Sequence, residues 1–253
     1  MIALSVNVNK VALLRNSRDT VIPSVVDYAL RCIRYGAHGI TVHPRPDQRH
    51  IRVDDCYDLK QAISVELNIE GNPFSPPMPS TRQGVSDYPG FMALVDAIRP
   101  AQCTLVPDAN HQLTSDHGFD LERDANKLRP ILKQLKDWGV RSSVFVDPNP
   151  STVAIAADLG ADRVELYTES FAREFERGHS QQSLELFART AEAAHGAGLG
   201  VNAGHDLNLD NLPLFSQVPH LAEVSIGHAL TADALYLGLE QTIQRYLSAL
   251  QHR

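Results

Sequence analysis

Short runs of apolar, often β-branched residues alternate along this chain with longer segments in which apolar residues recur every three or four positions. The first pattern is typical of buried strands and the second of amphipathic helices. The starts of the predicted strands lie roughly 20 to 40 residues apart, which leaves room for a helix in each gap. The eight predicted strands are Ala3–Val8, Gly39–His43, Val65–Glu70, Gln102–Val106, Ser142–Asp147, Arg163–Tyr167, Leu199–Asn202 and Glu223–Ile226.

Helical spacing is clearest in five segments, and a glycine follows the first four of them, as expected at helix ends. They are Pro23–Tyr35, Leu121–Trp138, Ser151–Leu159, Gln182–Ala197 and Ala232–Leu250. Alternation of strands and helices predicts parallel βαβ units. A doubly wound open sheet would usually carry a glycine-rich turn after its first strand, and Val6–Val11 contains no glycine. We therefore predict an α/β fold, a (β/α)8 TIM barrel in which residues 1–253 form a single domain.

Two stretches near the end of the chain, Val201–His205 and Val224–His228, each consist of a short strand-like run followed by Gly-His. Glycine at a strand end lets backbone N–H groups approach an anion, because no Cβ intervenes. The last two strands of such barrels often form a phosphate site. By contrast, Gly71–Tyr88 contains four prolines and is expected to be a loop, either a lid over the site or an insertion without function.

Composition excludes several classes of protein. The formal net charge is −7 with no basic run, which argues against nucleic acid as a partner. No apolar run reaches the ~20 residues of a membrane span, and the N-terminus does not have the pattern of a signal peptide. Three scattered cysteines form neither a disulfide framework nor a zinc motif. The expected location is the reducing cytoplasm.

The polar residues at the predicted strand ends are of two kinds. His43, Glu70 and His205 can transfer protons near neutral pH, and Glu70 follows an apolar run that would raise its pKa. The second group can hold anions and comprises Lys10, Arg18, Arg45, His50 and the glycines at the strand ends. Together they suit proton transfers on a small phosphorylated substrate.

Each of these residues also has a structural interpretation. A histidine at a strand end is often only hydrogen-bonded, Glu70 could be a solvated residue at the start of a loop, and Glu165 could be a buried ion-pair partner. No H-x-H or H-E-x-x-H spacing points to a metal. Lys10 is the one lysine at a strand end that could form a Schiff base, as in an aldolase.

The chain resembles the pyridoxine 5'-phosphate synthase family from Val6 to about Leu250. The matching segments, in order, are Leu14–Arg18, Gly39–His43 with Arg45 and Arg49–Ile51, Asn68–Glu70, Leu105–Pro107, Val201–His205 and Ile226–Ala229. The resemblance implies a barrel with extra helices and without metal or organic cofactor. It implies condensation of 1-deoxy-D-xylulose 5-phosphate with 3-amino-2-oxopropyl phosphate to give pyridoxine 5'-phosphate, inorganic phosphate and water. It also implies a homo-octamer.

The resemblance assigns roles to individual residues. His43 and Glu70 match proton acceptors, and His205 matches the proton donor. The positions that match the aminoketone phosphate site are Asn7, Arg18, Gly227 and His228, and those that match the deoxyxylulose phosphate site are Arg45, His50 and Thr114. The alternatives are another phosphosugar aldolase or isomerase on the same barrel, and a non-catalytic phosphosugar-binding barrel.

Three positions depart from the family pattern. Asn9-Lys10 stands where many members have Asp-His, and Asp206 follows His205 where many have Gly. A carboxylate beside a phosphate would repel it unless it points away or pairs with a cation such as Lys10. We therefore interpret Asn9, Lys10 and Asp206 as one rearranged set of charges in the substrate site.

Overall fold

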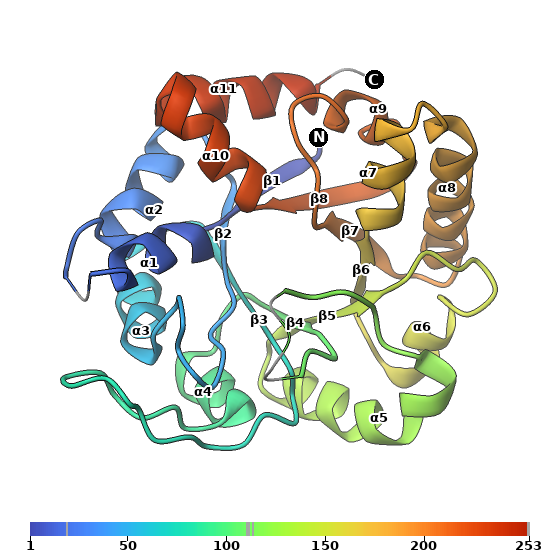
Figure 1. The fold of residues 1–253 in the computed structure, drawn as a ribbon. Coiled ribbons are helices and arrows are strands. Elements are labelled where there is room, and N and C mark those ends of the chain that lie inside the picture. Colours follow the sequence, from blue (N-terminus) through green and yellow to red (C-terminus); the bar gives the residue numbers. More distant parts are fainter. Residues whose placement is uncertain (19, 110–111, 113, 252–253) are drawn as a thin grey trace.

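Eight parallel strands close into one barrel, in which each strand pairs with its neighbours in sequence and the last pairs with the first (Figure 1). The structure is a computed structural model that describes residues 1–18, 20–109, 112 and 114–251. The strands are β1 (Ala3–Asn7), β2 (Gly39–Val42), β3 (Glu66–Gly71), β4 (Gln102–Leu105), β5 (Arg141–Val146), β6 (Arg163–Tyr167), β7 (Gly200–Gly204) and β8 (Leu221–Ile226). The predicted (β/α)8 barrel and all eight predicted strands are confirmed.

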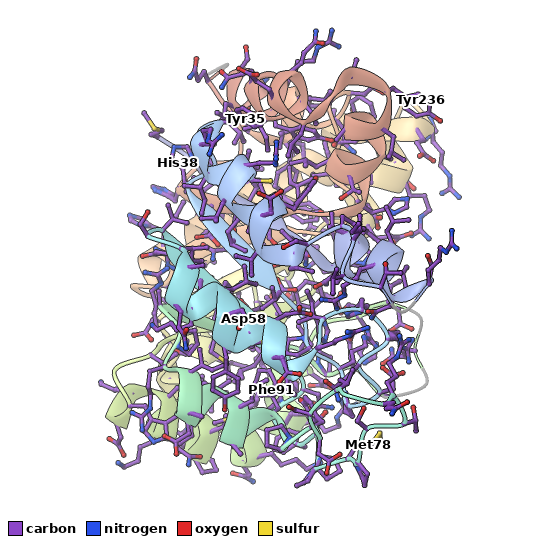
Figure 2. The ribbon with its side chains drawn as sticks, turned by 90° about the vertical axis from the view of Figure 1, so that its left-hand side faces the viewer. Tyr35, His38, Asp58, Met78, Phe91 and Tyr236 are labelled. Atoms are coloured by element: carbon purple, nitrogen blue, oxygen red, sulfur yellow. The ribbon has the colours of Figure 1, made fainter. Side chains whose placement is uncertain are left out.

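Eleven helices surround the barrel in the described part of the chain, so three gaps or ends hold a second helix beyond the basic eight. They are α1 (Asn9–Asn16), α2 (Val25–Arg34), α3 (Val53–Ala62), α4 (Phe91–Ile98), α5 (Leu121–Asp137), α6 (Ile155–Leu159), α7 (Glu169–Glu176), α8 (Ser180–Gly196), α9 (Leu212–Phe215), α10 (His228–Leu237) and α11 (Leu239–Ala249). In side view, α2 and α3 lie next to each other on the outside of the barrel (Figure 2). A membrane-spanning helix is not found anywhere in the described residues.

Two predicted helices differ from the structure. The predicted helix Ala232–Leu250 is wrong as one element, because Gly238 (φ 79°, ψ 149°) ends α10 and begins α11. The predicted start at Ser151 is also wrong, since α6 begins at Ile155. The Asn149 side chain accepts a hydrogen bond from the Ser151 N–H (2.9 Å), which holds a turn in place of the first helical residues.

The strands present two different faces. Alternate apolar side chains, such as Leu4 and Val6 in β1, are buried in the core between barrel and helices. The other face fills the barrel with hydrogen-bonded polar groups. Ser5 and Thr41 share a hydrogen bond of 2.7 Å, and the Thr104 hydroxyl donates to Asn68 (3.1 Å). The barrel interior is therefore a polar column that leads to the carboxyl ends of the strands.

The proline-rich segment after β3 is a loop, as predicted. Met78 and Tyr88 pair in an isolated antiparallel bridge, and the Ser86 hydroxyl donates to Asp54 of α3 (2.7 Å). The Gln48 side chain donates to the Ser86 carbonyl (2.8 Å). The loop extends outside the ring of strands, near α3 and α4 (Figure 1). That it closes over the site stays a prediction.

Candidate active site

The carboxyl ends of the strands bring most of the candidate residues to one rim. Asn7 ends β1, His43 directly follows β2, Glu70 lies one residue before the end of β3, and His205 directly follows β7. Because all eight strands are parallel, these positions share the face of the barrel on which such folds carry their sites.

Glu70 is a buried carboxyl group, 8% exposed, and its Oε2 accepts a 3.4 Å hydrogen bond from the Asn7 amide. Burial raises the pKa of Glu70 well above its usual value, and the negative charges of Glu165, Asp108 and Glu223 raise it further. Burial thus favours the protonated form of Glu70.

Glu165 projects into the barrel from β6 and is also buried. Burial and the neighbouring Glu223 raise the pKa of Glu165 to about 8, although the Thr104 hydroxyl donates to it (3.4 Å). A Cβ at position 204 would collide with the Glu165 carboxyl group, so Gly204 provides the space that this side chain occupies. Glu165 makes no ion pair among the described residues, so its interpretation as an ion-pair partner is wrong.

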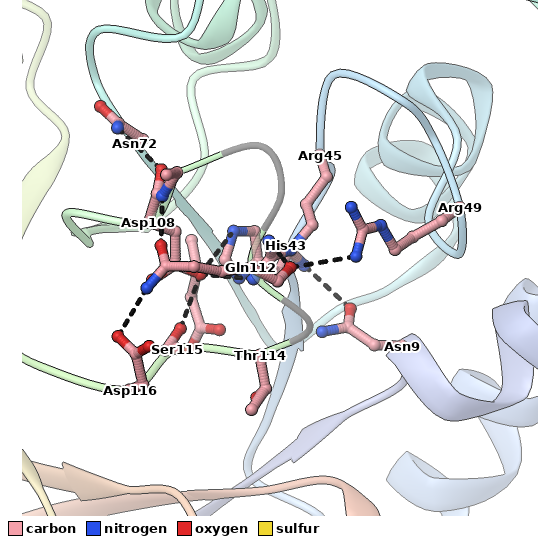
Figure 3. Close-up of polar contacts among 12 residues, drawn as sticks. Asn9, His43, Arg45, Arg49, Asn72, Asp108, Gln112, Thr114, Ser115 and Asp116 are labelled. Carbon is pink, nitrogen blue, oxygen red and sulfur yellow. Dashed lines mark hydrogen bonds and ion pairs between the residues drawn. The ribbon is translucent and has the colours of Figure 1, made fainter.

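His43 is 6% exposed and is fixed through its backbone, whose N–H donates to the Asn9 side chain (2.9 Å, Figure 3). Burial lowers the pKa of His43 well below its usual value, and Arg45, His50 and Arg49 lower it further. The imidazole is therefore neutral in the empty site, as a general base has to be. Asn9, one of the departures from the family pattern, thus positions His43.

Arg45 is buried and bound to the loop after β4, the segment between β4 and α5. Its guanidinium donates to Asp108 Oδ2 (2.5 Å) and to the carbonyl of Gln112 (2.9 Å). The Ser115 hydroxyl also donates to Asp108 Oδ2 (2.8 Å), and Arg49 donates to the same Gln112 carbonyl (3.0 Å, Figure 3). These bonds hold the loop after β4 against the loop after β2.

His50 lies in the same loop after β2. Its Nδ1 accepts a hydrogen bond from the Ile51 N–H (2.9 Å), so the neutral ring carries its proton on Nε2. Burial, followed by the charge of Arg45, lowers the pKa of His50 to about 3. The rings of His50 and His43 are 6.3 Å apart, and the exposed Lys10 contributes to the positive potential there.

His205 and Asp206 follow β7 with positive φ angles of 83° and 56°, which few non-glycine residues adopt. His205 Nδ1 is bonded to Asp206 Oδ2 (2.6 Å), and His205 Nε2 lies 2.9 Å from the Thr114 hydroxyl. The ring also packs edge-on against Tyr167 at 5.2 Å. The carboxylate of Asp206 thus pairs with His205, whereas Lys10 was the cation expected from the sequence.

The remaining predicted residues are Gly227, His228 and Arg18, and they differ in their contacts and exposure. Gly227 lies against Asn7, since a Cβ on Gly227 would be 3.0 Å from that of Asn7. His228 is exposed at the start of α10 and contributes to lowering the pKa of Asp206. Arg18 is exposed just beyond α1 and makes no hydrogen bond or ion pair with the other candidates in the described residues.

Sequence reasoning assigned no role to two residues that organise this site. Asp108, three residues beyond the end of β4, binds Arg45. Gln112 contributes its backbone carbonyl, which has no signature in a sequence. No group of three or more His, Cys, Asp or Glu residues arranged to hold a metal occurs in the described residues.

The barrel is closed, and acid–base and cationic groups lie at the carboxyl ends of its strands. These features define a (β/α)8 protein of the class whose sites lie at this face of the barrel. A family model described as "Pyridoxal phosphate biosynthesis protein PdxJ" matches residues 4–252, and the chain belongs to this family. A curated pyridoxine 5'-phosphate synthase of Xanthomonas campestris pv. campestris is 56% identical over 251 residues, covering 98% of this chain and 95% of the relative. A synthase of the same name from Porphyromonas gingivalis is 49% identical, with 99% of each chain covered.

Solved structures support the fold alone. Phosphoribosylanthranilate isomerase from Thermotoga maritima matches with a TM-score of 0.58 and 10% identity over 100% of both chains. 3-Keto-L-gulonate-6-phosphate decarboxylase from Vibrio cholerae matches with a TM-score of 0.60 and 12% identity, covering 98% of this chain and 97% of the other. At these identities the likeness concerns the barrel and not the reaction.

Proposed function

We propose that this chain is an enzyme, a pyridoxine 5'-phosphate synthase of vitamin B6 biosynthesis. The observation that carries the proposal is its 49–56% identity, over almost the full length of both chains, to curated proteins of that name. The reaction joins 1-deoxy-D-xylulose 5-phosphate to 3-amino-2-oxopropyl phosphate and closes the pyridine ring, with loss of inorganic phosphate and water.

The chemistry needs groups that move protons, since the steps are additions, eliminations and a ring closure. We assign proton acceptance to His43 and Glu70 and proton donation to His205. A neutral His43 supports the first assignment, because only the unprotonated imidazole accepts a proton. Burial favours the protonated form of Glu70, and a protonated Glu70 would have to transfer its proton before it can act as a base. Each positioned acid or base contributes about 10²–10⁴-fold in rate.

The two phosphates need cations and backbone donors. We assign one phosphate to Arg45, His50 and Thr114, and the other to Asn7, Arg18, Gly227 and His228. Lys10 and Asp206 belong to the same substrate-binding set, with Asp206 acting on His205. Support comes from the closeness of Gly227 to Asn7 and from the hydrogen bond between Thr114 and His205. Two substrates held in one site gain a proximity advantage over the free reactants.

The test is to incubate the purified protein with both substrates and to follow the pyridoxine chromophore together with released phosphate. Glu70→Gln should lower kcat at least 100-fold and leave phosphate affinity nearly unchanged, because the amide keeps the size but cannot take a proton. Glu66→Gln is the matched control, since Glu66 lies at the opposite end of the same strand. Wild-type protein that binds both substrates without turnover would refute the proposal and favour a phosphosugar-binding barrel.

Three further assignments remain proposals. Residues 1–253 form one domain, the protein works in the cytoplasm, and it assembles as a homo-octamer. The assembly rests on the family resemblance, and light scattering on the eluate of a size-exclusion column would measure it. A monomer at micromolar concentration would contradict it.

A further inference from the structure

We propose that Asp108 is a positioning residue that couples phosphate binding at Arg45 to proton uptake by His43. Asp108 has none of the roles proposed above, and the inference rests on the proposed function for the assignment of phosphate to Arg45. Asp108 pairs with Arg45 in the structure, and when phosphate binds Arg45 it pairs with His43.

Asp108 stands between the two groups that it would connect. Its Oδ2 is 2.5 Å from Arg45 Nη2 and 4.0 Å from His43 Nε2. The side chains of all three residues are at most 8% exposed, so water screens these charges poorly. Ser115 donates to the same oxygen (2.8 Å).

The second carboxylate oxygen, Asp108 Oδ1, is buried and has no hydrogen-bond partner among the residues that the structure describes. A buried carboxylate oxygen without a donor is costly, so such an atom calls for a functional explanation. A small cavity of about 10 Å³ is lined in part by His43, Arg45, Asn72 and Asp108. The carboxylate therefore has an unused acceptor in a cluster that is not completely filled.

Phosphate changes the partners of this cluster. A guanidinium binds phosphate through two parallel charge-assisted hydrogen bonds, and these compete with its single bond to Asp108. Once Arg45 turns to the phosphate, Asp108 is left buried with Ser115 as its remaining donor, which is unfavourable for a carboxylate. His43 can supply a positive charge beside Asp108, and a shift of about 1 Å brings it from 4.0 Å to hydrogen-bond distance.

The pairing also determines which nitrogen of His43 acts as the base. A hydrogen bond from Nε2–H to Asp108 leaves Nδ1 unprotonated and available. Nδ1 then takes the substrate proton, and the resulting imidazolium is stabilised by the carboxylate through Nε2–H. The proton leaves again from Nδ1 in a later step, so the histidine is regenerated.

Other charges act on the two groups as well. Arg45, Arg49 and His50 face His43 and disfavour its protonated form. The charged or titratable groups that act on Asp108 are Arg45, Asp116 and His117, and Asp108 in turn acts on Glu70. Phosphate has two effects on His43: it neutralises the arginines, and it releases Asp108 from Arg45. Both effects favour the protonated form of His43, but only the release depends on Asp108.

The test is an NMR titration of the His43 ring in histidine-labelled protein, with and without saturating inorganic phosphate. In wild type, phosphate should raise the pKa of His43 by about one unit or more, the range that an opposite charge at this distance produces. In Asp108→Asn at least half of that rise should disappear, and in Asp108→Glu it should return. Asp58→Asn, at an exposed position of α3, is the control and should behave as wild type. An equal rise in Asp108→Asn, or none in wild type, overturns the inference.

Kinetics separate positioning from a merely structural role. If Asp108 acts through His43, Asp108→Asn lowers kcat about 10-fold or more and moves the acid limb of the kcat–pH profile to lower pH. If Asp108 only supports Arg45, KM for deoxyxylulose phosphate rises and the acid limb stays in place, which overturns the inference. Should Asp108→Asn not fold, Ser115→Ala removes one donor from Oδ2, and the phosphate-induced rise should grow. An unchanged rise in Ser115→Ala overturns it too.

The NMR result does not depend on turnover. If phosphate raises the pKa of His43 only when Asp108 is present, but the protein makes no pyridoxine 5'-phosphate, the proposed function is refuted and the coupling stands. If turnover is normal but the pKa of His43 does not rise, the coupling is refuted and the proposed function stands.

Discussion

Replacing Glu165 by glutamine should stabilise this protein, and the gain should grow with pH. The side chain is 4% exposed, and its pKa is raised from 4.5 to about 8 by burial and by Glu223. In the unfolded chain the same carboxyl ionises near its ordinary value. Between these two pKa values the unfolded state releases a proton that the folded state keeps, so wild-type stability falls as the pH rises.

The size of the effect follows from the shift. Each pKa unit corresponds to about 1.4 kcal/mol, so Glu165 lowers the free energy of unfolding by about 3 kcal/mol at pH 7 and about 5 kcal/mol at pH 9. Near pH 5 the cost is about 1 kcal/mol or less, since pH 5 lies only about half a unit above the ordinary pKa of the carboxyl. Glutamine does not ionise, and its carbonyl can still accept the Thr104 hydrogen bond.

The assay is urea unfolding of wild type and Glu165→Gln between pH 5 and pH 9. We expect the difference in midpoint to increase up to about pH 8 and then to level off. Glu66→Gln is the control of opposite sign, because Arg141 lowers the pKa of Glu66 and removal of this charge should cost stability at neutral pH. A difference between Glu165→Gln and wild type that is constant with pH, or that shrinks as the pH rises, would refute the reasoning.

Two further substitutions test the loop after β7. Gly204→Ala places a methyl group in the space of the Glu165 carboxyl and should lower the free energy of unfolding by about 1–3 kcal/mol, with a large loss of turnover. Gly196→Ala is the control, because a Cβ there meets nothing within 4 Å and stability should be equal to wild type or higher. Equal urea midpoints in the two variants would contradict this account. Asp206→Asn keeps a hydrogen-bond acceptor for His205 and removes its charge, so kcat should fall about 10-fold, with little change in urea midpoint because the pair is partly exposed. Unchanged kcat in Asp206→Asn would show that the pairing has no catalytic role.

The strands could be predicted from the sequence because each is a short apolar run followed by a helical segment. Several helices could not. Phe91–Ile98 is apolar at most positions and only eight residues long, a pattern that fits a strand as well as a helix. Asn9–Asn16 has little amphipathic character, and no side chain caps its start. Both helices are recognised only from their packing against the barrel.

The rim residues could be predicted for a related reason, since topology alone places the ends of parallel strands together. Their partners could not be predicted. Arg45 binds the carbonyl of Gln112, which is 67 residues away in the sequence. His205 meets Asp206 because both residues have positive φ, which neither residue type predicts. Pairings of this kind depend on loop backbone geometry, for which sequence periodicity gives no information.

Burial is the largest cause of several pKa shifts in the site, and these shifts suit a reaction of two phosphorylated substrates. Burial keeps His43 and His50 neutral and favours the protonated form of Glu70. Phosphates bring negative charge that makes protonation of the imidazoles more favourable. Proton transfer thus becomes favourable when the substrates are bound, and binding energy from the phosphates is used to place protons for the chemical steps.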